Sequence, residues 1–266
     1  MIAMLEEIAT ELGLLLLRWR AEGVTHGQWE GTQLKADADR LAHSFLVEKL
    51  QRSWPGIPII SEEDGSAHNL SRPDEYWLID PIDGTASFCN GFDGFVTQLA
   101  LIRKCQPDLA IVHAPALGLT YTATENGPAL CNRKPISTAK CGVRAIVLID
   151  NYPEPRGVAR ELIDCAGKIQ YVECGSIGLK ICRVADSVAD LFVKDVKVQD
   201  WDLAPGHLIL KRAGGLLSLL DGASVPYGGG FERAGLIAAA NQEVFYQTTG
   251  WLKSGKTNWP SVLPIG

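Results

Sequence analysis

Apolar residues in the first fifty positions recur at the spacing of amphipathic helices. A helix is predicted for residues near 3 to 21, because large apolar side chains fall on one of its faces: Ile8, Leu12, Leu15 and Trp19. A second helix is predicted from about Asp37 to Arg52, with an apolar face of Leu41, Phe45, Val47 and Leu50. We therefore expect the chain to begin with two helices that each bury one face.

Short apolar runs between turn residues predict strands in the following part of the chain. One buried strand is expected from Ile57 to Ile60, and another runs through Tyr76-Trp-Leu-Ile-Asp80. Three further runs are separated by Pro and Gly turns, and they predict an antiparallel meander of Phe95 to Ile102, Leu109 to His113 and Leu119 to Ala123.

From about Lys140 strands and helices alternate. The predicted elements are the strand Ala145 to Asp150, the helix Arg156 to Ala166, the strand Ile169 to Glu173, the helix Gly178 to Ala185, the strand Ala189 to Val193, the helix Asp202 to Ala213, the strands Leu216 to Leu219 and Leu236 to Ala240, and a last helix from about Gln242. Such alternation is typical of layered α/β structure. We expect an α+β fold, a layered α-β-α-β-α sandwich in which an N-terminal half with an antiparallel sheet (1–139) packs on a C-terminal α/β half (140–266).

Composition and charge narrow the functional classes. The 266 residues are 46% hydrophobic and 21% charged, as in ordinary globular proteins. A formal net charge of -6 offers no basic surface for nucleic acid. The run Leu14 to Leu17 is far shorter than the ~20 apolar residues of a membrane helix, and no basic cluster precedes an apolar stretch as in a secretory signal. A cytoplasmic protein without membrane or nucleic-acid partners is expected. Its seven cysteines lack C-x-x-C spacing, which predicts reduced and mostly buried thiols.

Two carboxylates follow the apolar strand that ends near Asp80. Asp80 and Asp83 are three residues apart and precede the turn Gly84-Thr85. Open α/β sheets usually bind ligands at the carboxyl ends of their strands, and hard oxygen ligands suit Mg²⁺. The segment is therefore a candidate magnesium and phosphate site, although taken alone it is better explained as a strand, a Pro-containing turn and a helix cap at Asp83.

Three other points in the chain place acidic groups at the ends of predicted elements. They are Asp39 early in the second helix, Glu62-Glu63 after a strand, and Asp200 with Asp202 around Trp201. Each has an ordinary explanation on its own: a solvated helix residue, a polar loop, and a helix cap ahead of a Pro in the first helical turn.

Together these motifs resemble the inositol monophosphatase superfamily of magnesium-dependent, lithium-sensitive phosphomonoesterases. The resemblance rests on the order Glu62-Glu63, then Asp80-Pro-Ile-Asp-Gly-Thr85, then Trp201-Asp202-x-Ala-x-Gly206, and it extends from Asp39 to Gly215. It implies a homodimeric enzyme that hydrolyses a small phosphate ester by a metal-activated water.

The resemblance also implies roles for individual residues. Two or three Mg²⁺ ions are expected: Glu62, Asp80 and the carbonyl of Ile82 would hold the first, and Asp80, Asp83 and Asp202 the second, with a weaker third near Glu62. Thr85, oriented by Asp39, and Glu62 would help to activate the attacking water. The N–H groups of Gly84, Thr85 and Ala86 would donate to phosphate oxygens. Asp37 competes with Asp39 for the partner role, and Pro205 stands where alanine is usual.

The substrate depends on the second half of the chain. Gly175, Ser176 and Lys180 lie where family members contact the leaving group, and Lys194 stands where inositol-specific relatives have an acidic residue. Lysine there suits a second phosphate, and with Lys180 and Lys197 it favours the 3'(2'),5'-bisphosphate nucleotidase branch, which acts on 3'-phosphoadenosine 5'-phosphate. The alternatives are inositol monophosphate, another sugar or polyol phosphate, and a catalytically dead metal-binding scaffold.

Overall fold

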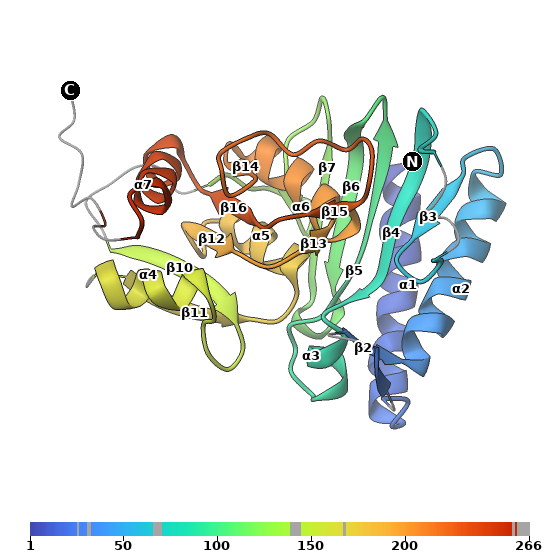
Figure 1. Cartoon of the computed structure of the whole chain (residues 1–266). Coiled ribbons are helices and arrows are strands. Elements are labelled where there is room, and N and C mark those ends of the chain that lie inside the picture. Colours follow the sequence, from blue (N-terminus) through green and yellow to red (C-terminus); the bar gives the residue numbers. More distant parts are fainter. Residues whose placement is uncertain are drawn as a thin grey trace.

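The computed structural model describes residues 1–25, 27–30, 33–65, 71–138, 145–166, 169–256 and 259. Helices and sheets alternate in layers across the molecule, with two helices outside the first sheet, two between the sheets and two outside the second (Figure 1). The expected α-β-α-β-α sandwich is confirmed. Among the described helices, none combines the length and apolar composition that crossing a membrane requires.

The first sheet has seven strands in the order β3-β4-β5-β6-β7-β8-β9. They are β3 (Ile59–Ser61), β4 (Glu75–Asp83), β5 (Val96–Arg103), β6 (Gln106–Ala114), β7 (Leu119–Thr124), β8 (Leu130–Cys131) and β9 (Lys134–Pro135). β3 is parallel to β4, and the other neighbours are antiparallel. The predicted meander is therefore confirmed.

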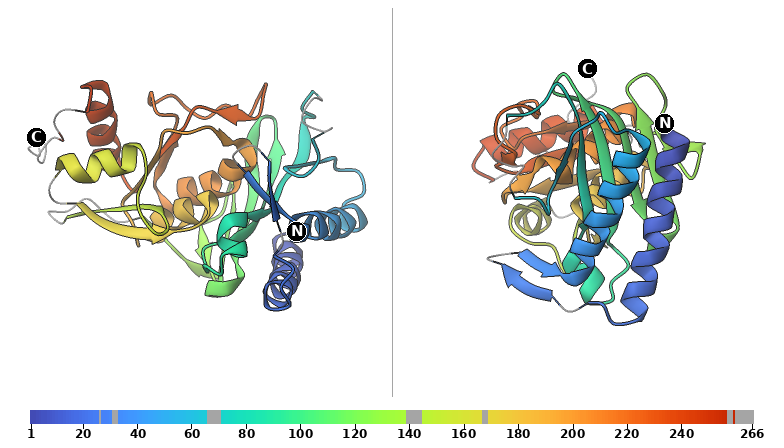
Figure 2. Two further views of the ribbon diagram at one scale, coloured as in Figure 1. Left: turned by 60° about the horizontal axis from the view of Figure 1, so that its bottom comes forward. Right: turned by 90° about the vertical axis from the view of Figure 1, so that its right-hand side faces the viewer.

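Both faces of the first sheet are covered, which explains why its central strands are apolar throughout. In β4, Trp77 and Ile79 pack on α1 (Ile2–Ala21) and α2 (Asp37–Ser53), as the helical periodicity predicts. Tyr76 and Leu78 point to the other face and pack on α5 (Ile177–Ala185) and α6 (Asp200–Ala213). The outer pair α1 and α2 lie side by side over the sheet in Figure 2.

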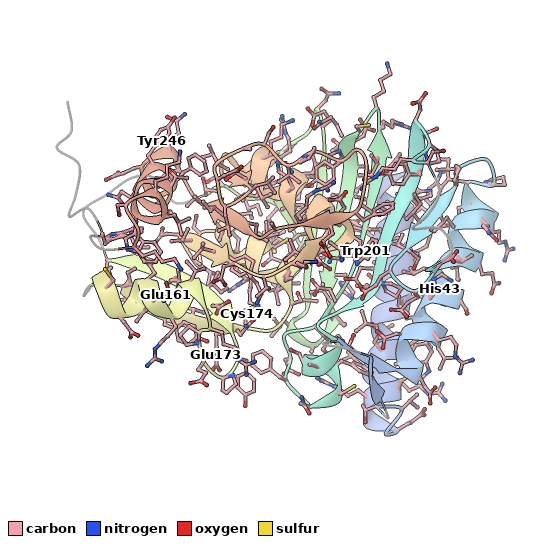
Figure 3. All side chains as sticks on the ribbon, in the orientation of Figure 1. His43, Glu161, Glu173, Cys174, Trp201 and Tyr246 are labelled. Atoms are coloured by element: carbon pink, nitrogen blue, oxygen red, sulfur yellow. The ribbon has the colours of Figure 1, made fainter. Side chains whose placement is uncertain are left out.

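The second sheet has five strands in the order β11-β10-β12-β16-β14. They are β10 (Ile146–Asn151), β11 (Ile169–Cys174), β12 (Leu191–Lys194), β14 (Leu216–Ser218) and β16 (Leu236–Ala239). β10 is parallel to β11 and β12, whereas β16 is antiparallel to β12 and β14. Its outer face packs on α4 (Val158–Ala166) and α7 (Gln242–Lys253). Its inner face meets α5 and α6 in the same apolar cluster as the first sheet, which also holds Cys174 and Trp201 (Figure 3).

The differences from the predicted elements are small and local. A hairpin of β1 (Gly27–Glu30) and β2 (Gln33–Ala36) and a short pair of β13 (Val198–Gln199) and β15 (Glu232–Arg233) were not predicted. Such short segments contain too few residues to show a period. α3 (Thr85–Cys89) is likewise little more than one turn.

The helix that carries Asp202 begins earlier than predicted. α6 starts at Asp200, because the Asp202 carboxylate accepts from the Gln199 N–H at 2.8 Å while the Gln199 side chain accepts from the Asp202 N–H in return. Asp202 is thus the third helical residue, and Pro205 lies inside the helix and not in its first turn as expected. Pro205 removes the N–H that would bond to the Trp201 carbonyl, and the helix continues past it to Gly214.

The cysteines are more exposed than expected. Of the six described, Cys174 and Cys182 are buried, Cys89 and Cys131 are partly exposed, and Cys105 and Cys165 are exposed. All six are free, and Cys141 lies outside the described residues. Cys105 is exposed because it sits in the turn between β5 and β6 with positive φ, so its side chain belongs to neither face of the sheet.

Candidate functional site

Three carboxylates from distant parts of the chain meet at one place. Glu62, Asp80 and Asp202 each offer an oxygen, and these oxygens lie within 4.8 Å of one another. We call these three residues the acidic cluster. The parallel pairing of β3 with β4, continued by the bond from Glu62 N–H to the Ile79 carbonyl at 3.1 Å, brings the first two together. The first turn of α6 supplies the third.

An irregularity in β4 separates Asp80 from Asp83. The pairing with β5 shifts between these residues, where Pro81 has no N–H and the Ile82 N–H donates to Asp80 Oδ1 at 3.1 Å. β4 then continues to Asp83, which is paired with Val96, so Asp83 is a strand residue and not a helix cap. The cap of α3 is Gly84, whose φ of 89° suits glycine.

Asp83 joins the first sheet to α5. Its carboxylate accepts from the Gly178 N–H at 2.7 Å and the Ile177 N–H at 3.3 Å, in the first turn of that helix. Gln98, on β5, donates from Nε2 to Asp83 Oδ2 at 3.1 Å and to Asp80 Oδ2 at 3.3 Å. Sequence reasoning missed Gln98, although an amide in a strand buried on both faces is itself a signal of a polar partner.

The electrostatics of these carboxylates favour a bound cation. Burial, together with the charges of Asp83 and Glu62, raises the pKa of Asp202 well above its usual value. Burial also raises the pKa of Asp83 to about 6, against the lowering effect of the Gly178 N–H and Lys180. Buried carboxylates that repel one another are stabilised by divalent cations, and an all-oxygen donor set is the kind that Mg²⁺ prefers.

Thr85 is paired with Asp39. Its Oγ1 lies 3.0 Å from Asp39 Oδ1 and 3.1 Å from the Ile82 carbonyl, so both acceptors compete for one hydroxyl proton. Asp39 is buried, whereas Asp37 is exposed and lies 3.6 Å from Arg40. Of the two aspartates, Asp39 is therefore the hydrogen-bond partner of Thr85. Gly84 caps α3, and Thr85 and Ala86 are its first residues. Their N–H groups are the ones predicted to donate to phosphate oxygens.

Gly175 and Ser176, which are expected to contact the substrate and which we call the substrate segment, are held tightly against the first half of the chain. The Ser176 N–H donates to the Gly94 carbonyl at 2.7 Å, and a Cβ at Gly175 would clash with that same carbonyl. Ser176 is buried, and its Oγ caps α5 by accepting from the Leu179 N–H at 2.9 Å. Gly175 and Ser176 thus position the start of α5, on which Asp83 also depends.

Lys180 and Lys194 share one acceptor. Lys180 Nζ donates to Asn151 Oδ1 at 2.8 Å and to the Gly175 carbonyl at 2.9 Å, and Lys194 Nζ donates to the same Asn151 oxygen at 3.2 Å. We call these two residues the lysine pair. Burial and then the charge of Lys194 lower the pKa of Lys180 to about 8. Lys197 is not part of this arrangement, because it forms an exposed ion pair with Glu232.

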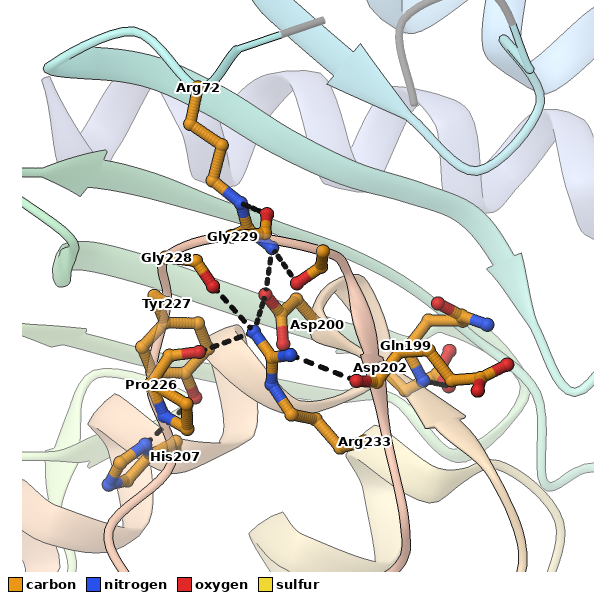
Figure 4. Close-up of polar contacts among 12 residues, drawn as sticks. Arg72, Gln199, Asp200, Asp202, His207, Pro226, Tyr227, Gly228, Gly229 and Arg233 are labelled. Atoms are coloured by element: carbon orange, nitrogen blue, oxygen red, sulfur yellow. Dashed lines mark hydrogen bonds and ion pairs between the residues drawn. The ribbon is translucent and has the colours of Figure 1, made fainter. Parts of the chain in front are cut away.

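Arg72, Arg233 and Asp200 form a buried network at the start of α6, which we call the arginine clasp (Figure 4). Asp200 Oδ2 lies 2.5 Å from Arg72 Nη2 and 2.9 Å from Arg233 Nη2, and Asp200 is fully buried. Arg72 also donates to the carbonyls of Gly229 and Gly230 and lies 3.9 Å from the ring centroid of Phe231. The clasp therefore ties the segment before β4 and the loop before β15 to a helix turn that carries Asp202. Sequence reasoning noted Asp200 but gave no sign of either arginine.

Comparison with known proteins identifies one family and several relatives. The model of the inositol monophosphatase family matches residues 1–251. The 3'(2'),5'-bisphosphate nucleotidase CysQ of Aggregatibacter actinomycetemcomitans is 31% identical over 228 residues, which cover 83% of this chain and 85% of the relative. The CysQ of Salmonella typhimurium strain LT2 is 33% identical over 200 residues, 71% of this chain and 78% of the relative. The Nus factor SuhB of Salmonella typhimurium strain 14028s is 29% identical over 232 residues, 84% of each chain.

Solved structures show the same fold. An IMPase of Thermotoga maritima superposes with a TM-score of 0.82 at 24% identity, covering 93% of this chain and 94% of that one. The extragenic suppressor protein SuhB of Bartonella henselae gives a TM-score of 0.81 at 22% identity, with 96% and 98% covered.

Proposed function

This chain belongs to the inositol monophosphatase family and is a hydrolase of phosphoric monoesters, and we propose that it removes the 3'-phosphate from a nucleoside 3',5'-bisphosphate such as 3'-phosphoadenosine 5'-phosphate. The observation that carries the proposal is the lysine pair, Lys180 and Lys194, which meet at Asn151 beside the turn that begins α5. The names of the CysQ relatives support the same substrate class.

The donor set of the site fits magnesium. Glu62, Asp80 and Asp202 converge without any nitrogen or sulfur ligand among them, Asp80 is buried, and the charges of Asp83 and Glu62 help to raise the pKa of Asp202, so a divalent cation would stabilise the cluster. We propose that these three residues, with Asp83 and the carbonyl of Ile82, hold two or three Mg²⁺ ions. When bound, the ions would neutralise phosphate charge and stabilise the attacking and leaving oxygens of an in-line displacement.

The residues of the chain itself would position water and phosphate. Thr85 directs its hydroxyl proton to Asp39 or to the Ile82 carbonyl, which leaves the lone pairs of Oγ1 available to accept a hydrogen bond from the attacking water and so to orient it. Glu62 lies at the same site and would share this orienting role. The amides of Gly84, Thr85 and Ala86 would donate to the scissile phosphate.

The lysine pair would bind the phosphate that is not cleaved. Lys180 is 1% exposed and already donates to two acceptors, so Lys194 would make the outer contact with an anion and Lys180 the inner one. A phosphate dianion would relieve the repulsion between the two ammonium groups. A neutral polyol offers no such charge. Asn151 keeps the two lysines at a common point, and Gly175 connects that point to the start of α5 through the bond from Lys180.

The decisive experiment compares two substrates side by side. We expect kcat/KM for 3'-phosphoadenosine 5'-phosphate to exceed that for inositol 1-phosphate, and Lys194→Glu to lower the first value far more than the second. Lys197→Glu is the matched control, because Lys197 is an exposed lysine near in sequence whose partner is Glu232. Equal losses on both substrates in Lys194→Glu would remove the argument for a bisphosphate nucleotide, and absence of Mg²⁺-dependent turnover across a panel of esters would indicate a dead scaffold.

The oligomeric state is a separate proposal. We infer a homodimer from the family alone, and light scattering on the purified protein tests it directly.

A further inference from the structure

Two aromatic rings from different halves of the chain are stacked on each other, and one of them directly follows Asn151 in the sequence. Phe92 follows α3, and Tyr152 follows β10. Their ring centroids are 4.1 Å apart and their planes differ by 11°. We call these two residues the aromatic pair. Neither ring belongs to the apolar clusters that form the core, and 48% of Tyr152 is exposed, so the stack is not explained by core packing.

Tyr152 is held at the substrate segment by its backbone. Its N–H donates to the Cys174 carbonyl at 3.1 Å, and Cys174 directly precedes Gly175 and Ser176. The residue before it is Asn151, the common acceptor of Lys180 and Lys194. Tyr152 therefore directly follows the residue that positions the lysine pair, and its backbone is bonded to the residue before Gly175.

Phe92 is fixed where Gly94 of the first half meets Gly175 of the second half. A Cβ built on Gly94 would lie 2.6 Å from Phe92 Cε1 and 2.5 Å from the Gly175 N, so the phenyl ring, Gly94 and the substrate segment are packed with no spare volume. The Phe92 N–H donates to the Ser87 carbonyl at 2.9 Å, which anchors the loop to α3. Phe92 thus forms a rigid backing for Tyr152.

We propose that the aromatic pair is the nucleobase platform of this enzyme, on which the base stacks against the exposed Tyr152 ring that Phe92 holds in place. This inference rests on the proposed function, because it needs a substrate with a base. Nucleobases stack on exposed aromatic rings in a sequence-tolerant way, and each such contact is typically lost when the ring is replaced by alanine. The acidic cluster with its Mg²⁺ ions, the lysine pair and the aromatic pair would then bind the cleaved phosphate, the spared phosphate and the base of one nucleotide.

The test compares the nucleotide with a substrate that differs only in lacking the base. The two probes are 3'-phosphoadenosine 5'-phosphate and its tetrahydrofuran analogue, which carries both phosphates and no base. We expect Tyr152→Ala to lower kcat/KM for the nucleotide about tenfold, chiefly through KM, and to leave the value for the abasic analogue unchanged. Tyr152→Trp should restore the nucleotide value, and Phe92→Ala should reproduce part of the loss.

Tyr246→Ala is the matched control. Tyr246 is also an exposed tyrosine beside a phenylalanine, but it lies on α7 at the far end of the molecule (Figure 3). Thermal unfolding of each variant checks that the fold is kept, and Tyr152→Leu provides a second substitution that retains apolar bulk without a π face.

The outcomes separate the two proposals. If wild-type enzyme hydrolyses nucleotide and abasic analogue with equal kcat/KM, or if Tyr152→Ala affects both alike, the base platform is wrong and the bisphosphate function stands. If wild-type enzyme hydrolyses inositol 1-phosphate but neither bisphosphate, the proposed function fails and the base platform fails with it.

Discussion

Asp83 accepts a hydrogen bond from the Gly178 N–H at 2.7 Å, and this bond joins a carboxylate of the first sheet to the first turn of α5. The same helix carries Lys180. Any shift of α5 would therefore change the surroundings of Asp83 and the place of the lysine pair together. The position of Gly178 is tight, because a Cβ there would overlap the amide of Gln98, which in turn bonds to both Asp80 and Asp83.

We predict that Gly178→Ala destabilises the protein by about 1–3 kcal/mol, as overpacking in a close-packed interior does, and also lowers kcat. Urea denaturation and steady-state kinetics measure the two effects. The control is Gly250→Ala, because a methyl group added at Gly250 in α7 would meet no atom within 4 Å and alanine favours helix. Equal stability of the two variants would show that the contact between Gly178 and Gln98 is not tight in solution.

We predict that Asp202→Asn abolishes turnover and at the same time stabilises the metal-free protein at neutral pH. The pKa of Asp202 is raised in the fold, so its ionised form is unfavourable there, and the folded state loses stability as pH rises from the unfolded pKa near 3.8 toward neutrality. An uncharged amide removes that penalty. Thermal unfolding with and without Mg²⁺ is the measurement.

In the wild type Mg²⁺ should raise Tm, and in Asp202→Asn this rise should shrink. Asp83→Asn should also shrink this rise, but it should not stabilise the metal-free protein, because an amide has one oxygen for the hydrogen bonds that both Asp83 oxygens accept from the Ile177 N–H, the Gly178 N–H and Gln98. Near-wild-type turnover of either variant at ordinary Mg²⁺ would show that the ligand assignment is wrong.

We predict that kcat/KM for the bisphosphate substrate falls above a pH of about 8. Burial lowers the pKa of Lys180 to about 8, so the ammonium that would bind the spared phosphate is lost above that pH. Because the charged form is unfavourable in the fold, the protein should also gain stability as pH rises from about 8 toward the unfolded lysine pKa of 10.5. The fall of kcat/KM above pH 8 should be absent in Lys180→Met. It should also be absent when inositol 1-phosphate is the substrate. If the pH profile of kcat/KM is unchanged in Lys180→Met, the fall at high pH is due to another titrating group.

We predict that Asp200→Ala costs about 3–5 kcal/mol of stability, because it leaves the buried guanidinium groups of Arg72 and Arg233 without their carboxylate. The exposed pair of Arg160 and Asp164 is the comparison, and breaking it should cost about 0–1 kcal/mol. Urea denaturation measures both. Asp200→Asn, which keeps the side-chain volume, should raise the Mg²⁺ concentration needed for half-maximal activity, since Asp202 is two residues away on the same helical turn. A cost for Asp200→Ala as small as that of the exposed pair would mean that the clasp is not buried in solution.

The layered fold could be predicted because its elements are long or strongly periodic. α1 and α2 show helical spacing, and the buried strands of the first sheet are continuous apolar runs. The start of α6 could not be predicted, because it depends on a capping box whose first member, Gln199, is an unusual choice for that position. The hairpin from Gly27 to Ala36 is too short to show a period.

The site was predictable where its residues fall in recognisable motifs, which also include the Thr85–Asp39 pair. Glu62, Asp80 and Asp202 were found through sequence motifs, and the structure brings these three together. Gln98 and Asn151 were missed, because their significance lies in partners that are distant in sequence. A polar amide within or just after a buried strand needs a hydrogen-bond partner, so each could have been marked as a residue with an unknown partner. Their roles in substrate binding and catalysis stay predictions.

The acidic cluster takes Glu62 and Asp80 from the first sheet and Asp202 from α6, which is synthesised much later. A nascent chain that has emerged only as far as β9 has all seven strands of the first sheet, but one face of that sheet still lacks its covering helices. Synthesis of α6 then supplies both the missing carboxylate and part of the apolar cover. If Asp202 is a metal ligand, the complete ligand set and the last part of the cover of that face arise in the same step of translation, and we expect a truncated product that ends before α6 to be inactive and prone to aggregate.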